Sequence, residues 1–182
     1  MPTVVVPFRA GDAKRRLSPA PDDIREALAE AMLADVLAAC EAVGPTMLAT
    51  REDGQGQAVA AALREVDELP VLVVNADLPC AHARDLLALL GRLPEGGLAL
   101  VAARDGTTNA LALSSPDLFA PLYGPGSSQR FLAHAARLRV PATTVEIPNL
   151  VDDVDTLPDL EQLEGRVGPA TAAALNELRL PR

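Results

Sequence analysis

Aromatic side chains are scarce in this chain of 182 residues, which has three phenylalanines, one tyrosine and no tryptophan. Because 49% of the residues are nevertheless hydrophobic, the core has to be packed from alanine, leucine and valine. No apolar run approaches the ~20 residues that a membrane-spanning helix needs, and no basic segment with a cleavage site stands at the start. The composition therefore predicts one soluble, cytoplasmic domain covering residues 1–182, without a membrane partner.

Cysteine and lysine are scarce as well. Cys40 and Cys80 are the only cysteines, too few for a disulfide framework and without metal-site spacing, so we expect two free thiols. The formal net charge of −9 argues against a nucleic acid or an anionic membrane as partner. Lys14 is the only lysine among the sixteen basic residues, and it stands beside Arg15 and Arg16. An anionic ligand would need such a local concentration of positive charge.

Apolar runs alternate with helical patterns along the whole chain. Unbroken apolar runs such as Val-Leu-Val-Val are typical of strands that are buried on both faces, as in a parallel sheet covered by helices. The sequence therefore predicts an α/β fold with a mostly parallel sheet, whose ligands bind at the carboxyl ends of the strands. The strands that we expect cover residues 3–7, 45–50, 71–75, 98–102 and 142–147.

Carboxylates occur at two of the places where strands give way to loops. Asp77 follows the strand at 71–75, and Asp153 and Asp155 precede a helix for which Thr156 is a plausible N-cap. Separated aspartates without cysteine or histidine ligands indicate a hard cation such as Mg²⁺, which also binds water and substrate phosphates. An ordinary polar turn residue is the alternative interpretation of Asp77.

Three loops have residues suited to binding anions. Residues 8–19, after the first strand, contain the basic cluster around Lys14, which a solvated charged surface would also explain. Asp105-Gly106 is first of all a hairpin signal, although the two threonines and the asparagine that follow could donate to an anion. Residues 123–128 form a glycine-rich turn with serine N-caps before a helix expected from Gln129, which suits either phosphate binding or simple capping.

Together these features fit metal-assisted nucleotidyl transfer. The sequence has no P-loop, no kinase signature and no convincing Ser/His/Asp order. A phosphate nucleophile is already charged at neutral pH, because the second pKa of a phosphomonoester is about 6. Metal, lysine and positioning could therefore carry the reaction without a general base.

Five motifs occur in an order that resembles one enzyme family. They are Val-Val-Pro-Phe-Arg with Ala-Lys-Arg-Arg-Leu-Ser-Pro in residues 5–19, Asn-Ala-Asp-Leu-Pro at 75–79, Asp-Gly-Thr-Thr-Asn-Ala-Leu at 105–111, Gly-Pro-Gly-Ser at 124–127 and Asp-Val-Asp-Thr-Leu-Pro-Asp-Leu at 153–160. They resemble the guanylyltransferases of coenzyme F420 biosynthesis, which activate 2-phospho-L-lactate or phosphoenolpyruvate with GTP. The acidic motifs are shared with nucleotidyltransferases in general, whereas Thr-Asn-Ala-Leu with Gly-Pro-Gly-Ser singles out this branch.

The resemblance implies a Rossmann-like, glycosyltransferase-A-type fold, a three-layer sandwich, and a set of site residues. The acceptor phosphate would attack the α-phosphorus of GTP in line and release pyrophosphate, with Lys14 and Asp77 as the catalytic residues. The implied sets are Arg9, Lys14 and Arg16 for the GTP phosphates, Asp77, Asp153 and Asp155 for Mg²⁺, and Thr108, Gly124 and Ser127 for the phospho-acid.

Residues 50–58 depart from the family pattern, because Gly-Gln-Gly-Gln-Ala stands where Gly-Leu-Asn-x-Ala is usual. This region helps to recognise the base in related enzymes, so the residues that recognise guanine are not assigned. Phosphoenolpyruvate, 2-phospho-L-lactate and 3-phosphoglycerate are all acceptors to consider. The arginine- and alanine-rich, lysine-poor composition resembles that of a high-GC bacterium, in which members of this family tend to use phosphoenolpyruvate.

Two other functions are compatible with these residues. One is a different Mg²⁺-dependent nucleotidyltransferase, such as a molybdenum-cofactor guanylyltransferase, and the other is a non-catalytic nucleotide-binding regulatory protein. Relatives often form homodimers, although the sequence leaves the oligomeric state open.

Overall fold

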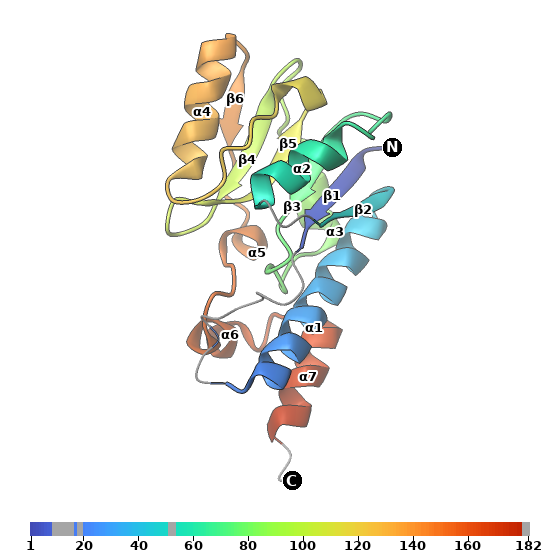
Figure 1. The fold of residues 1–182 in the computed structure, drawn as a ribbon, viewed down its shortest axis with the longest axis vertical. Helices are drawn as coiled ribbons and strands as arrows, with labels where there is room; N and C mark the ends of the chain where they lie inside the picture. Colours follow the sequence, from blue (N-terminus) through green and yellow to red (C-terminus); the bar gives the residue numbers. More distant parts are fainter. Residues whose placement is uncertain (9–16, 18–19, 51–53, 180–182) are drawn as a thin grey trace.

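The computed structural model of this chain describes residues 1–8, 17, 20–50 and 54–179. The residues expected to bind the GTP phosphates, Arg9, Lys14 and Arg16, lie outside the described residues. In chain order, the elements are β1 (Thr3–Pro7), α1 (Asp22–Glu41), β2 (Thr46–Ala49), α2 (Gln55–Leu63), β3 (Val71–Val74), α3 (Ala83–Leu90), β4 (Leu98–Ala102), β5 (Thr108–Leu113), a 3-10 turn (Pro116–Leu118), α4 (Ser127–Leu138), β6 (Ala142–Thr144), α5 (Pro148–Val151), α6 (Leu157–Leu163) and α7 (Pro169–Arg179) (Figure 1).

Six strands in the described part of the chain form one sheet in the order β2-β1-β3-β5-β4-β6. β1 pairs in parallel with β2 and β3, and β4 pairs in parallel with β6, whereas β5 lies antiparallel between β3 and β4. The predicted α/β fold with a mostly parallel sheet is therefore confirmed. Because β5 runs in the opposite direction, its first residues lie at the sheet edge where β3 ends: Val74 pairs with Ala110.

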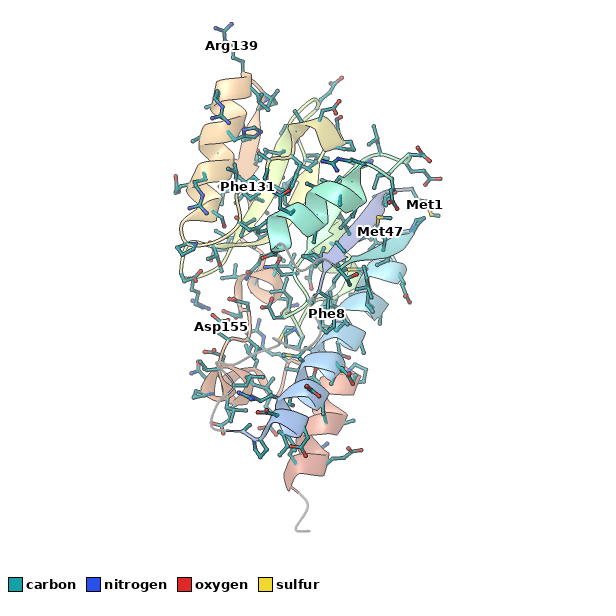
Figure 2. The ribbon with its side chains drawn as sticks, viewed as in Figure 1. Met1, Phe8, Met47, Phe131, Arg139 and Asp155 are labelled. Atoms are coloured by element: carbon teal, nitrogen blue, oxygen red, sulfur yellow. The ribbon has the colours of Figure 1, made fainter. Side chains whose placement is uncertain are left out.

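Helices cover both faces of the sheet, as the apolar strand sequences predict. All four residues of β3 are buried, because alternate side chains point to opposite faces and each face is packed. One face packs against α1, α3 and α5, and the other packs against α2 and α4. Figure 1 shows α2 lying over the sheet, where it packs against β1 and β2. Figure 2 shows Phe131 of α4 directed toward the sheet.

A third apolar cluster lies beyond the end of the sheet. The 20 residues of α1 make a helix ~30 Å long, and its first half packs against α6 and α7 (Figure 1). The buried Asp35 of α1 accepts hydrogen bonds from the backbone N–H groups of Ala170 and Thr171, each at 2.9 Å. This carboxylate satisfies two of the unpaired donors at the start of α7. It thereby joins the two helices.

Two local features differ from the expectations. A single helical turn, α5, follows the short strand β6 and begins at Pro148, a residue favoured in the first turn of a helix. Helix α4 begins at Ser127, two residues before the expected start, and its N-cap is Gly126, which has no capping side chain. The expected serine N-caps are therefore wrong. No helix in the described ranges is long and apolar enough to cross a membrane.

A candidate active site at the carboxyl ends of the strands

Three aspartates from distant parts of the chain meet at the end of β3. Asp77 follows β3, whereas Asp153 and Asp155 lie between α5 and α6 (Figure 2). One carboxylate oxygen from each lies within 4.8 Å of the other two. Oxygens around a Mg²⁺ ion lie about 3–4.2 Å apart, since each Mg–O distance is about 2.1 Å. The three side chains therefore fit a divalent cation, and all three are half-buried.

Burial and the charges of its neighbours perturb the ionisation of Asp153. Burial raises the pKa of Asp153 to about 6, the negative charges of Asp77 and Asp155 add to this rise, and a hydrogen bond involving Asn109 opposes it. Three ionised carboxylates this close together are unfavourable unless a cation is bound among them. The arrangement is thus electrostatically suited to hold a metal ion.

The neighbouring Asp152 forms ion pairs instead. Its Oδ1 accepts from Arg104 at 2.7 Å, and its Oδ2 accepts from Arg166 at 3.0 Å. Burial alone would raise the pKa of Asp152, but the hydrogen bonds from the two arginines outweigh it and lower the pKa below its ordinary value. Arg166 also donates to the Pro148 carbonyl and to Asn149 Oδ1. Asp152 therefore anchors the segment that carries Asp153 and Asp155, the two metal-site aspartates that follow it.

A capping interaction fixes the other end of the same segment. Thr156 is the N-cap of α6, as predicted, and its hydroxyl accepts from the Asp159 N–H. In return, Asp159 Oδ2 accepts from the backbone N–H groups of Thr156 and Asp155, at 2.7 and 3.2 Å. The Val154 N–H donates to the Asp77 carbonyl at 3.0 Å, which ties the segment to the end of β3. Backbone contacts thus bring the three carboxylates together.

Two buried hydroxyl groups, those of Thr108 and Ser127, lie together next to the β4–β5 turn. Ser127 Oγ donates to Thr108 Oγ1 at 3.0 Å, and the exposed fractions of the two residues are 0% and 1%. Ser128 Oγ donates to the Gly106 carbonyl at 2.8 Å. These contacts explain why the serines do not cap α4: their hydroxyls join the helix to the β4–β5 turn and to the first residue of β5. The Ser127 N–H donates to the Gly124 carbonyl at 3.0 Å. The three residues expected to bind the phospho-acid, Thr108, Gly124 and Ser127, therefore lie together.

Two asparagines link these groups: the sequence assigned no role to Asn75 and predicted only that Asn109 could donate to an anion. Asn75 donates to the Thr108 carbonyl at 3.1 Å and accepts from Gln55 at 2.7 Å. Asn109 donates to the carbonyls of Leu150 and α5's last residue. Both stand inside the motifs that carry the family resemblance, which was the only available signal. Their partners are 20 to 42 positions away, and such contacts cannot be read from spacing.

A cavity of about 340 Å³ opens beside the carboxylates. It is lined by the Arg104–Asp152–Arg166 bridge, by Asp153 and Asp155, and by side chains of α6. Positive and negative side chains thus face the same space. That combination suits a metal ion together with an anionic ligand.

Solved structures define the class of the fold. A candidate nucleotide-diphospho-sugar transferase from Desulfovibrio desulfuricans G20 superposes with a TM-score of 0.73 at 18% identity, over 96% of this chain and 94% of that one. The Rv0371C protein of Mycobacterium tuberculosis H37Rv, solved with manganese, superposes with a TM-score of 0.54 at 18% identity, over 88% and 96% of the two chains. These superpositions show that the fold is that of the nucleotide-diphospho-sugar transferases, and one of the two structures contains a divalent metal, manganese.

Sequence relatives define the family. A phosphoenolpyruvate guanylyltransferase from Sphaerobacter thermophilus is 43% identical over 52% of this chain and 46% of that protein. A 2-phospho-L-lactate guanylyltransferase from Natrialba magadii is 34% identical over 96% and 92% of the two chains. A phosphoenolpyruvate guanylyltransferase from Streptomyces scabiei is 33% identical over 98% of both. Residues 41–166 match the family described as "Guanylyl transferase CofC like", and the chain belongs to this family.

Proposed function

We propose that this protein transfers GMP from GTP to phosphoenolpyruvate or 2-phospho-L-lactate and releases pyrophosphate, forming the activated precursor for coenzyme F420. The observation that carries the proposal is the meeting of Asp77, Asp153 and Asp155 in a member of this family. A cation-binding cluster at the carboxyl end of β3 is where an α/β nucleotidyltransferase would bind its nucleotide. Phosphoenolpyruvate is the acceptor that the composition favours.

The proposed metal is Mg²⁺, bound by the three aspartates. When bound, it would neutralise negative charge on the phosphates of the nucleotide and help to align them. Arg9, Lys14 and Arg16 would bind the same phosphates from the loop after β1, an assignment that rests on the family resemblance alone. Asp152 supports the metal site indirectly, because its two arginine partners fix the segment that carries Asp153 and Asp155.

The proposed acceptor site consists of Thr108, Ser127 and the backbone at Gly124. Their hydrogen-bonding groups would orient the phospho-acid so that a phosphate oxygen faces the α-phosphorus of GTP. The bond from this oxygen to the α-phosphorus forms as the bond from the α-phosphorus to the bridging oxygen of the β-phosphate breaks. Pyrophosphate leaves, and no proton has to be removed from the nucleophile, because it is already ionised. Catalysis then depends on positioning and charge neutralisation.

The decisive experiment measures pyrophosphate release with Mg²⁺, crossing GTP, CTP and ATP against phosphoenolpyruvate, 2-phospho-L-lactate and 3-phosphoglycerate. Release with GTP and one of these acceptors supports the proposal. Release with another nucleotide would favour a different nucleotidyltransferase. No release from protein that binds GTP would favour the regulatory function.

Light scattering during size-exclusion chromatography would test the homodimer that relatives suggest.

Two variants assign roles within this reaction. Asp77→Asn should abolish turnover while circular dichroism shows an intact fold, because the variant loses one carboxylate of the metal site. The matched control is Asp117→Asn, which changes an exposed carboxylate in the 3-10 turn and should leave activity unchanged. Ser127→Ala should raise the KM for the acceptor and leave the KM for GTP unchanged. The opposite pattern would place this loop on the nucleotide.

A further inference from the structure

We propose that Arg130 is a positioning residue that shapes the acceptor-binding loop. This inference rests on the proposed function, in which Gly124 and Ser127 contact the phospho-acid. Arg130 is the fourth residue of α4, and its guanidinium points back to the loop that precedes the helix. Its donors contact three backbone carbonyls there: Leu122 at 3.2 and 2.7 Å, Tyr123 at 3.0 Å, and Pro125.

The place of Arg130 on α4 is electrostatically unfavourable for a cation. The start of a helix carries a partial positive charge, so basic side chains are disfavoured in the first turn. The three carbonyls offset this cost, because a guanidinium presents its donors as a planar fork that can bridge several acceptors at once. In the described part of the chain, every side-chain hydrogen bond of Arg130 goes to this loop.

Because the peptide unit is planar, these contacts to carbonyls also fix the direction in which the N–H groups of the loop point. In a planar trans peptide the N–H points opposite to the C=O. With the carbonyls of residues 122, 123 and 125 held by the guanidinium, the N–H groups of Tyr123, Gly124 and Gly126 point away from it. Gly124 and Gly126 have positive φ angles of 109° and 69°, which glycine adopts without steric cost. Successive N–H groups that point outward from a loop form a seat for an anion.

The charge of Arg130 lies close behind this seat. A Cβ atom at Gly124 would lie 3.6 Å from Arg130 Nη2, so the guanidinium is directly behind the backbone that would contact the acceptor. Ser127, whose hydroxyl donates to the buried Thr108 hydroxyl, is the next residue after Gly126. Arg130 thus acts through the loop, on the orientation of its N–H groups and on the local potential. We expect it to govern acceptor affinity and not nucleotide affinity.

The test compares Arg130→Met with Arg137→Met. Both substitutions remove a guanidinium from the same helix, but the contact of Arg137 is with His134, away from the loop. Arg130→Met should raise the KM for the acceptor about tenfold or more, since hydrogen bonds to charged groups are among the strong ones. The KM for GTP should stay within about twofold. Arg130→Lys should recover part of the acceptor affinity, because an ammonium keeps the charge but lacks the planar fork.

Binding can be followed without turnover. Tyr123 is the only tyrosine in a chain without tryptophan, and it lies in the loop, with its ring centroid 5.5 Å from that of Phe131. Its fluorescence should respond to phosphoenolpyruvate or 2-phospho-L-lactate added without nucleotide. In Arg130→Met the half-saturating concentration should rise by the same factor as the KM, whereas Arg137→Met should match the wild type.

The outcomes distinguish a failure of the inference about Arg130 from a failure of the proposed function. An active wild type with an unchanged acceptor KM in Arg130→Met overturns the role of Arg130 and leaves the proposed function intact. An equal rise in the KM values for GTP and acceptor also overturns it, because the effect would then be general. A wild type that neither releases pyrophosphate nor changes its fluorescence with these acceptors overturns the proposed function, and the role of Arg130 with it.

Discussion

Replacing Asp153 by asparagine should stabilise the metal-free protein and remove most of its stabilisation by a divalent cation. In the absence of metal, the ionised Asp153 is disfavoured by burial and by the charges of Asp77 and Asp155. Asparagine has nearly the same shape and no charge, so the unfavourable interactions disappear. With metal present, the same substitution removes a ligand. The two effects have opposite signs, which makes the prediction specific to a metal site.

The magnitude follows from the raised pKa of Asp153. The difference between its ordinary value of 3.8 and about 6 corresponds to at most ~3 kcal/mol at neutral pH, at ~1.4 kcal/mol per pH unit. Because the side chain is only half-buried, solvent screening reduces this cost to ~1–2 kcal/mol. For a protein of this size, the corresponding rise in Tm is ~2–8 °C. A cation at one hundred times its Kd stabilises the wild type by ~2.7 kcal/mol, most of which the variant should lose.

The assay is thermal unfolding at pH 7.5, with EDTA or with MgCl₂ or MnCl₂. Asp152→Asn is the matched control, because it neutralises the adjacent carboxylate, whose partners are Arg104 and Arg166. This control should lower the metal-free Tm and keep most of the metal-dependent increase. If Asp153→Asn instead lowers the metal-free Tm and keeps the response to metal, both the electrostatic argument and the metal assignment are wrong.

Two further predictions concern stability and thiol chemistry. Asp35→Ala should lower the free energy of unfolding by ~2–3 kcal/mol in urea, because two N–H groups of α7 lose their buried acceptor; a loss below ~0.5 kcal/mol would contradict this role. Burial raises the pKa of Cys40 to about 12 and that of Cys80 to about 11, from 9.0, so thiol reagents should label them only after unfolding. Stability should also fall as the pH rises above 9, because the unfolded chain then loses thiol protons that the native state retains. Rapid labelling of the native protein would contradict the burial of both thiols.

Local signals in the sequence predicted several of the elements. The apolar run at 71–75 predicted a strand covered on both faces, and β3 is buried throughout. Thr156 predicted the start of α6. Asp105-Gly106 predicted the hairpin between β4 and β5. These predictions hold because burial, capping and turn geometry depend on residues within a few positions of each other.

The predictions that failed concern residues whose partners lie far away in the sequence. The two serines that begin α4 are good N-caps by residue type, but Ser127 donates to Thr108, 19 positions earlier, and Ser128 to Gly106, 22 positions earlier. Spacing along the chain gave no indication of either partner. The same holds for Asp152, to which the sequence assigned no role and which pairs with Arg104, 48 positions away.

The sequence by itself determined the class of fold, the kinds of elements and, through its motifs, the family and the residue types of the site. Only the tertiary structure decided which groups meet. The insertion of β5 between β3 and β4 brings Thr108 beside Asn75, and the bond from Val154 to the Asp77 carbonyl closes the carboxylate cluster. These contacts arise from long-range packing, which a local pattern does not encode.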